Sequence, residues 1–206
     1  MSIVLIDYGS GNLHSAKKAF ERAATMSNRP DLIQVSADPE AVRRADRVVL
    51  PGVGAFADCK RGLASIPGML EALDEAVTQR GVPFLGICVG MQIMFERGVE
   101  HGSFDGIGAL KGTVEKMSAP VLPHMGWNTV EVHGNSKLFK GIEKESFYFV
   151  HSYAVHDANV EVGATTDYYG EFTSAIEVGS ITATQFHPEK SGAAGLKLIN
   201  NWVESL

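Results

Sequence analysis

The sequence predicts an α/β fold: an open, mostly parallel sheet flanked by helices, with an antiparallel, strand-rich second half. Through about residue 100, short and nearly continuous apolar runs alternate with stretches of helical period, as in buried parallel strands joined by helices. From about residue 113 to residue 185 the runs become short β-rich segments separated by Gly, Asn, Asp and Pro, which is typical of hairpins. A sheet of the flavodoxin-like kind accommodates both halves.

The first half supplies the parallel strands and their helices. Apolar residues that recur three or four positions apart predict one helix through Leu13, Ala16, Phe20 and Ala23 and another through Leu70, Leu73, Ala76 and Val77. The strands are expected at residues 3–6, 48–50 and 84–87, where the apolar runs are continuous.

The second half supplies the antiparallel strands and a final helix. Gly179 and Ser180 provide a hairpin turn, and Leu196, Ile199 and Val203 form one face of a helix that begins after Gly192. The strands are expected at residues 129–132, 147–150, 161–165, 174–178 and 181–185.

The composition is that of a globular protein. Of 206 residues, 45% are hydrophobic and 20% are charged, and the sequence has no internal repeat, low-complexity tract or linker, which predicts a single domain over residues 1–206. A net charge of −6 disfavours nucleic-acid binding, because phosphate surfaces are held mainly by clustered Lys and Arg. Apolar runs far shorter than ~18 residues predict no membrane span, and no basic segment marks a signal peptide.

The cysteine content favours a reducing compartment. Cys59 and Cys88 are the two cysteines, and neither belongs to a metal-binding C-x-x-C pair. We therefore expect a cytoplasmic protein without a metal site or cofactor.

A strand-to-helix turn around Cys88 is the most informative motif. The letters G-I-C-V-G at 86–90 follow a buried strand and precede a helix expected to end at Gly98. Such a turn strains the central residue, exposes it at the carboxyl edge of the sheet and places it where helix N–H groups stabilise a thiolate. The N–H of Val89 then points to where an oxyanion would form. By itself the motif also fits a buried structural thiol, the interpretation we favour for Cys59.

A second motif strengthens the nucleophile hypothesis for Cys88. The letters F-H-P-E-K at 186–190 follow the last strand, and Pro188 biases His187 toward an extended conformation. Side chains two apart in an extended chain point the same way, so Glu189 can orient the imidazole while His187 accepts the thiol proton. Alone, this motif also fits a solvated turn.

The loop at 51–54, P-G-V-G, lies at another strand end. It lacks the Gly-Lys-Ser/Thr of a phosphate-binding P-loop. Both loops open onto the carboxyl edge of the sheet, so we expect this loop to supply a second oxyanion N–H beside Cys88.

Together the motifs at 51–54, 86–92 and 186–190 resemble those of class I (triad) glutamine amidotransferases, over nearly the full length. The motifs at 7–13, 123–128 and 148–153 are similar to those of a narrower family, the glutaminase subunits of imidazole glycerol phosphate synthases. This resemblance implies that L-glutamine is hydrolysed and that ammonia passes to a separate (β/α)8-barrel cyclase subunit. The resulting heterodimer would form imidazole glycerol phosphate and AICAR in histidine biosynthesis.

The resemblance also implies roles for individual residues. Cys88, His187 and Glu189 match the catalytic triad, and Val53 and Val89 match the oxyanion donors. Glu96 competes with Glu100 on spacing as the partner of the glutamine ammonium. The substrate-binding positions are matched by Gly52, Gln92, Glu100, Ser152 and Tyr153.

Four positions match residues that face the cyclase in the family: Asn12, Trp127, Tyr148 and Lys190. Each has a structural alternative, such as a core position for Trp127. Residues 109–112 and Tyr169 depart from the usual loops of the family, which bears on loop shape rather than chemistry. Two other functions stay open: the glutaminase of a different amidotransferase, and a non-catalytic regulatory module with the same fold.

Overall fold

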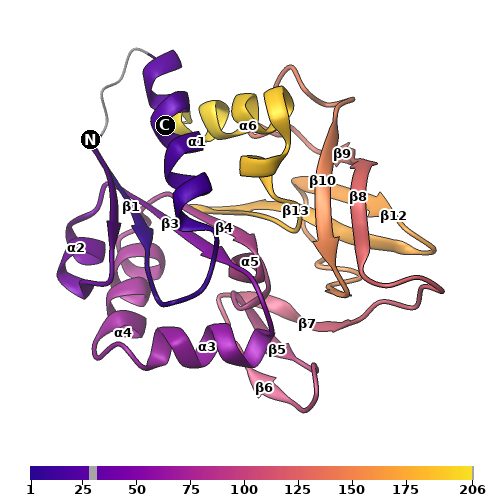
Figure 1. The fold of residues 1–206 in the computed structure, drawn as a ribbon, viewed down its shortest axis with the longest axis horizontal. Helices are drawn as coiled ribbons and strands as arrows, with labels where there is room; N and C mark the ends of the chain where they lie inside the picture. Colours follow the sequence, from indigo (N-terminus) through magenta and orange to yellow (C-terminus); the bar gives the residue numbers. More distant parts are fainter. Residues whose placement is uncertain (28–31, 206) are drawn as a thin grey trace.

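A computed structural model of the chain describes residues 1–27 and 32–205, and its centre is an eight-stranded sheet (Figure 1). The first five strands in spatial order are parallel and the last three add on in antiparallel fashion, which confirms the predicted α/β class. The order is β2 (Leu32–Ser36), β1 (Ser2–Ile6), β3 (Arg47–Gly52), β4 (Phe84–Cys88), β14 (Ile181–Thr184), β13 (Glu171–Val178), β12 (Gly163–Asp167) and β9 (Glu131–His133).

Helices cover both faces of the parallel part. Helices α1 (Leu13–Met26) and α6 (Gly192–Glu204) pack together on one face, where the Phe20 and Trp202 rings meet edge to face at 5.8 Å. The other face carries α2 (Pro39–Arg44), α3 (Phe56–Ala64) and α4 (Met69–Leu73), which continues into a π-helical turn at Asp74–Gln79. Right-handed crossovers explain this division. After β1 the chain moves across the sheet to β2, and after β2 it moves back past β1 to β3, so the helices that follow these two strands lie on opposite faces.

Two small sheets extend the antiparallel half. One pairs β8 (His124–Thr129) with β10 (Ser146–His151). The other has the order β11 (Tyr153–Ala154), β7 (Leu110–Lys116), β5 (Phe95–Gly98) and β6 (Phe104–Asp105). The strand expected at 129–132 is divided between β8 and β9, which belong to different sheets.

The helix expected to run from Val89 to Gly98 is wrong beyond its first turn. Helix α5 spans only Val89–Gln92, and the chain then forms β5 between β6 and β7. A Cβ on Gly98 would lie 2.6 Å from the Phe56 ring, so this strand packs too closely against α3 for any side chain at that position. The apolar residues before Gly98 suit a buried strand as well as a helix, and the pairing of β5 with β7 decides in favour of the strand.

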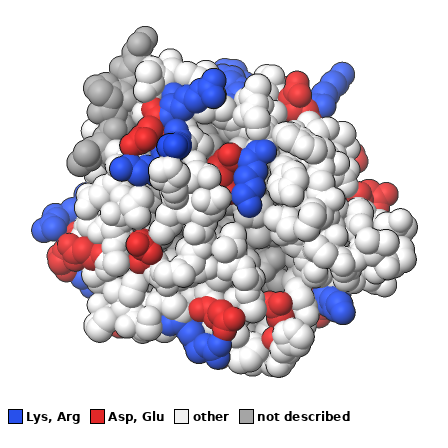
Figure 2. All heavy atoms as spheres, in the orientation of Figure 1, with Lys and Arg blue, Asp and Glu red and all other residues white. Residues whose placement is uncertain are grey.

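Surface charge is mixed on the face seen in Figure 2, where Lys and Arg side chains lie among Asp and Glu rather than in one basic patch. Among residues 1–27 and 32–205, none of the helices has the length and hydrophobicity needed to cross a membrane.

Candidate active site

The turn at Cys88 has the strained geometry that its flanking glycines predict. Cys88 ends β4 with φ +55° and immediately precedes α5. A Cβ on Gly90 would lie 1.8 Å from the Leu50 carbonyl oxygen, and one on Gly86 would lie 2.8 Å from the Gly90 oxygen. The turn therefore excludes side chains on both sides of the cysteine, and the structure holds the Cys88 side chain at the end of the strand.

His187 and Glu189 reach the same edge of the sheet. Strand β14 runs parallel to β4 with Thr184 opposite Ile87, so the residues after β14 emerge beside Cys88. His187 Nδ1 lies 2.8 Å from Glu189 Oε1, and the two side chains are 2% and 4% exposed. Since an ionised carboxylate only accepts hydrogen bonds, Nδ1 is the donor, which leaves Nε2 for the cysteine.

The electrostatics of this group favour a charged imidazole. Burial lowers the pKa of His187, but hydrogen bonds and charge interactions with Cys88 and Glu189 outweigh it and raise the pKa to about 10. Apart from its interaction with Cys88, His187 Nε2 is buried without a hydrogen-bond partner among the described residues. The imidazole is therefore positioned to hold a proton between carboxylate and sulfur.

Val53 lies beside Cys88, but its N–H is already engaged. Gly52 is opposite Cys88 in the sheet, and a Cβ on Gly52 would lie 2.6 Å from the Gly90 nitrogen, so this loop closely approaches α5. The Val53 N–H donates to Ser10 Oγ at 3.4 Å, and the Ser10 hydroxyl donates to the Val53 carbonyl at 2.6 Å. In this structure Val53 therefore offers no free N–H to an oxyanion.

Cys88 and His187 line a cavity of about 250 Å³. Predicted substrate residues Gln92, Glu100, Ser152 and Tyr153 lie around it. Its full lining is Val53, Gly54, Cys88, Val89, Gln92, Glu100, Pro123, Val150, His151, Ser152, Tyr153 and His187. The structure thus brings together residues from widely separated parts of the sequence.

The two candidate acids are separated by the fold. Glu100 lines the cavity, and its Oε2 accepts the Phe56 N–H at 2.9 Å. Glu96 is exposed and accepts the Gly112 N–H at 3.1 Å, away from the cavity lining. The geometry therefore favours Glu100 over Glu96 as a ligand of a substrate ammonium.

Gln92 is buried in α5 rather than exposed on its surface. Its Nε2 donates to the Tyr153 carbonyl at 2.8 Å and to Gln185 Oε1 at 2.9 Å. Both amide hydrogens are used, and Oε1 is the atom left for a substrate.

Four polar residues near the site were not predicted from the sequence to take part in it: Gln185, Ser10, His124 and His151. Gln185 stands two residues before His187, and that spacing was the signal that its side chain shares a direction with the imidazole. Ser10, His124 and His151 lie within the motifs at 7–13, 123–128 and 148–153, but their spacing assigned them no role, because the Ser10–Val53 and His124–His151 contacts join residues far apart in the chain.

The residues predicted to face a partner lie at the surface. Trp127 on β8 is 59% exposed, so the alternative of a core position is wrong, and its ring meets Tyr148 of β10 at 6.2 Å. Asn12 caps α1 by accepting the Ser15 N–H at 3.3 Å, and Lys190, which follows Glu189, is exposed. Val121 and Met125, which are close to Trp127 in the sequence, are also exposed and add to the apolar surface.

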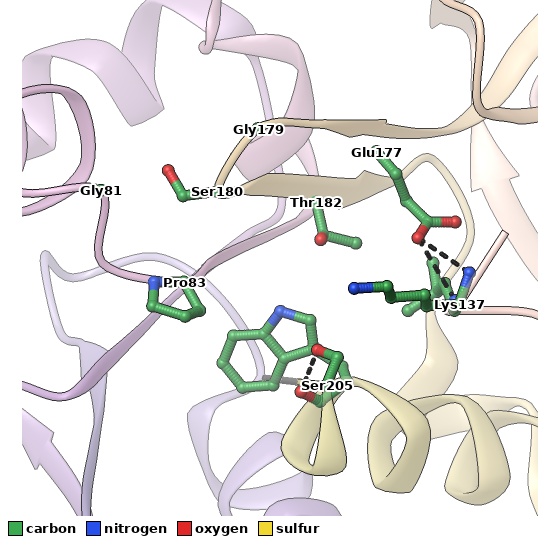
Figure 3. Close-up of a pocket in the computed structure, with 10 residues that line it drawn as sticks. Gly81, Pro83, Lys137, Glu177, Gly179, Ser180, Thr182 and Ser205 are labelled. Carbon is green, nitrogen blue, oxygen red and sulfur yellow. Dashed lines mark hydrogen bonds between the residues drawn. The ribbon is translucent and has the colours of Figure 1, made fainter. Parts of the chain in front are cut away.

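Size alone does not locate the site. A cavity of about 430 Å³ lies at the opposite end of β4, between Pro83, Thr182 of β14 and Ser205 after α6 (Figure 3). Neither cysteine lines it, whereas the strained Cys88 and the His187 imidazole line the smaller cavity. Within the described ranges, no group of three or more His, Cys, Asp or Glu is arranged to hold a metal ion.

Comparison with known proteins identifies the class. Residues 4–206 match the glutamine amidotransferase class-I family, and the chain belongs to this family. Two solved glutamine amidotransferases share the fold. One has a TM-score of 0.70 with 16% identity over 94% of each chain, and another, from Thermotoga maritima, has a TM-score of 0.64 with 18% identity over 99% of this chain and 81% of its own.

Closer relatives indicate a narrower group. The chain is 49% identical to imidazole glycerol phosphate synthase subunit HisH of Rhodopseudomonas palustris over 99% of each chain. It is 51% identical to the protein of that name from Rhodospirillum rubrum over 98% of each chain. For Nocardia farcinica the identity is 49%, over 100% of this chain and 98% of the relative.

Two buried histidines near the cavity predict sensitivity to acid. Burial lowers the pKa of His124 to about 4 and that of His151 to about 3, below the ordinary value of 6.5. The unfolded chain therefore binds more protons below pH ~6.5, and each histidine removes up to ~1.4 kcal/mol of stability per pH unit. We expect the melting temperature to fall between pH 7 and pH 5. His124→Phe should reduce this slope while exposed His14→Gln leaves it unchanged; equal slopes in all three proteins would contradict the assignment.

Proposed function

We propose that this chain is the cytoplasmic glutaminase subunit of an imidazole glycerol phosphate synthase and that it hydrolyses L-glutamine to glutamate and ammonia. The observation that carries the proposal is the buried row of Glu189, His187 and Cys88 at the cavity, with Nδ1 of His187 bonded to the carboxylate. A sulfur nucleophile, a base and an orienting acid are the groups needed to cleave an amide through a thioester.

The reaction follows from the protonation states. With its pKa raised to about 10, His187 is a strong enough base to take the Cys88 proton, and the sulfur attacks the side-chain carbonyl carbon of glutamine. The tetrahedral oxyanion collapses, the carbon–nitrogen bond breaks, and His187 gives its proton to the departing nitrogen to release ammonia. Water then attacks the thioester with His187 as base, which releases glutamate and restores the thiol proton to the pair.

Substrate recognition uses atoms that the fold leaves free. Because both amide hydrogens of Gln92 are engaged, its Oε1 accepts from the ammonium group of glutamine, and the Glu100 carboxylate supplies the opposite charge. Ser152 and Tyr153 hold the substrate from the other side of the cavity, and Gly52 keeps the oxyanion loop close to α5.

The partner we propose is a (β/α)8-barrel cyclase subunit in a heterodimer. We assign residues 1–206 to one glutaminase domain, and the ammonia that it releases passes to the cyclase to form imidazole glycerol phosphate and AICAR. The exposed Trp127 and the half-buried Tyr148, with Asn12 and Lys190, form the surface proposed for this contact. Tryptophan and tyrosine are frequent anchors of protein interfaces.

Activation of the lone chain tests this function. The Val53 N–H faces Ser10, so the resting site lacks one oxyanion donor, a loss worth about 10²-fold to 10³-fold in kcat. We expect weak glutaminase activity for the lone chain and an increase of that order for the complex with the cyclase and a phosphoribulosyl substrate analogue. The analogue must bind more tightly to the complex with the active loop, since equal affinity would shift nothing.

The assay is glutamate release by the lone chain, the complex and the liganded complex. Ser10→Ala should raise the lone-chain rate several-fold because it removes the hydroxyl that holds Val53, while Ser15→Ala in α1 should not. A lone chain as fast as the liganded complex would make the protein a constitutive glutaminase. No glutamine hydrolysis in any of the three samples would refute the function.

A further inference from the structure

Gln185 directs its side chain toward the nucleophile. It follows β14, is fully buried, and places Nε2 3.7 Å from Cys88 Sγ. Its backbone N–H donates to the Ser174 carbonyl at 2.8 Å, which fixes this end of the chain against β13. The question is which end of the amide faces the sulfur, since a nitrogen would stabilise a thiolate and an oxygen would repel it.

The hydrogen-bond pattern answers this question without reference to the sulfur. The Tyr153 carbonyl can only accept, so the Gln92 atom 2.8 Å from it is the donor Nε2. The same nitrogen lies 2.9 Å from Gln185, whose atom there must be the acceptor Oε1. The nitrogen of Gln185 is consequently the atom that faces Cys88. Reversing either amide would set two donors or two acceptors against each other.

A buried histidine pair holds the Tyr153 carbonyl in place. His151 Nδ1 donates to this carbonyl at 3.0 Å, so its Nε2 is the acceptor for His124 Nδ1, also at 3.0 Å. His124 Nε2 then accepts from Asn128 Nδ2 at 3.3 Å. Asn128 has its own direction set, because Nδ2 also donates to the Asp167 carbonyl and Oδ1 accepts the Thr129 N–H.

The Tyr153 carbonyl at one end of these contacts and Asn128 at the other require the same arrangement, in which each histidine is neutral and protonated only on Nδ1. Burial, which lowers the pKa values of His124 and His151 to about 4 and about 3, keeps them in that state at neutral pH. Every contact between Asn128 and Cys88 therefore has a defined donor and acceptor. Donation runs from Asn128 through His124 and His151 to the Tyr153 carbonyl, and from Gln92 both to that carbonyl and through Gln185 to Cys88, so the acceptor of Gln185 has no competing orientation.

We propose that Gln185 is a catalytic residue that donates a hydrogen bond to the Cys88 thiolate, and that Gln92, His151 and His124 are positioning residues that orient its amide. This inference rests on the proposed glutaminase function. An amide N–H stabilises the negative sulfur without taking a proton from it, so it complements His187 rather than replacing it. It acts before attack and again when the thioester releases the sulfur as a leaving group.

Other groups also act on the Cys88 charge, and the test must separate them. His187 faces the sulfur as the proton acceptor, Tyr8 and Cys59 interact with it from the β3 side, and Glu100 and His151 line the same cavity. None of these groups changes when the Gln185 side chain is replaced, which makes that side chain the variable to test.

Alkylation of Cys88 in the intact complex without glutamine measures the thiolate directly. Iodoacetamide rates are followed from pH 5 to pH 10 by peptide mass mapping, with buried Cys59 as the internal reference. Gln185→Met keeps a linear side chain but has no N–H, and Gln185→Glu keeps an acceptor for Gln92 while placing oxygen against the sulfur. The matched control is Ser174→Ala, which removes a neighbouring buried hydroxyl that has no partner among the described residues.

We expect the half-maximal pH of Cys88 alkylation to rise by about one unit in Gln185→Met and at least as much in Gln185→Glu. With glutamine, kcat should fall about tenfold or more while KM changes little, as for loss of one hydrogen bond to a charged atom. Ser174→Ala should match wild type in both. If Gln185→Met fails to fold, Gln185→Glu still decides. Alkylation profiles that superimpose on wild type, or a loss confined to KM, would overturn the role of Gln185.

The orienting arm has its own test. His124→Phe keeps a ring stacked between Phe149 and Tyr168, at 4.8 Å and 4.0 Å, but removes both ring nitrogens. It should lower kcat several-fold in the wild-type chain and add no further loss in Gln185→Met. Additive losses would overturn the positioning role. Alkylation needs no glutamine, so failure of the glutaminase function and failure of the Gln185 contact give different results.

Discussion

Cys88→Ser is expected to abolish glutamine hydrolysis, with kcat/KM lower by about 10⁴-fold or more. The hydroxyl is a far weaker nucleophile than a thiolate at neutral pH, and no other buried group at the cavity can form the thioester. The fold should survive, because oxygen replaces sulfur at a 4% exposed position without adding volume to the tight turn. Glutamate release and a thermal melt, run side by side, separate lost chemistry from lost structure.

Cys59→Ser is the matched control. Cys59 is also fully buried, and it donates to the Val53 carbonyl at 3.3 Å, a bond that a serine hydroxyl can also make. Its activity should remain within a few-fold of wild type. A glutamine analogue with an electrophilic carbon should label Cys88 alone, and labelling of Cys59 with Cys88 unmodified would refute the nucleophile assignment.

His187→Ala is expected to have the second large effect, a loss of about 10⁴-fold in kcat, since it removes both the base and the proton donor for ammonia. Glu189→Gln should cost less, about 10²-fold, because the imidazole remains. An amide nitrogen in place of Oε1 would favour the other tautomer of His187, which has its proton on Nε2 and cannot accept the thiol proton.

The pH profile distinguishes the two roles. The carboxylate of Glu189 contributes to the raised pKa of His187, after the hydrogen bond with Cys88, so Glu189→Gln should lower that pKa from about 10. The upper limb of the activity profile would then move to lower pH, whereas Glu189→Asp should shift it less. If Glu189→Gln matched wild type in rate and profile, the acid would leave the triad and a Cys/His dyad would remain.

The sequence by itself determined the elements whose causes are local. Continuous apolar runs predicted β1, β3 and β4, because strands buried on both faces tolerate few polar residues. The glycines at 86 and 90 predicted a strained turn at Cys88, because a tight turn needs residues without side chains beside it; Gly86 meets the Gly90 backbone within the turn itself, although Gly90 meets Leu50 on the neighbouring strand. The two-residue spacing of His187 and Glu189 predicted their contact, because side chains two apart in an extended chain point the same way.

Only the tertiary structure decided how those local elements are used. Residues 95–98 became a strand because β7 pairs with them, although their letters also suit a helix. Trp127 is exposed because β8 pairs with β10 outside the main sheet. Ser10 meets Val53 across 43 positions, and Gln92 meets Gln185 across 93. Such contacts depend on which surfaces pack together, and packing is set by the whole chain rather than by any local pattern of residues.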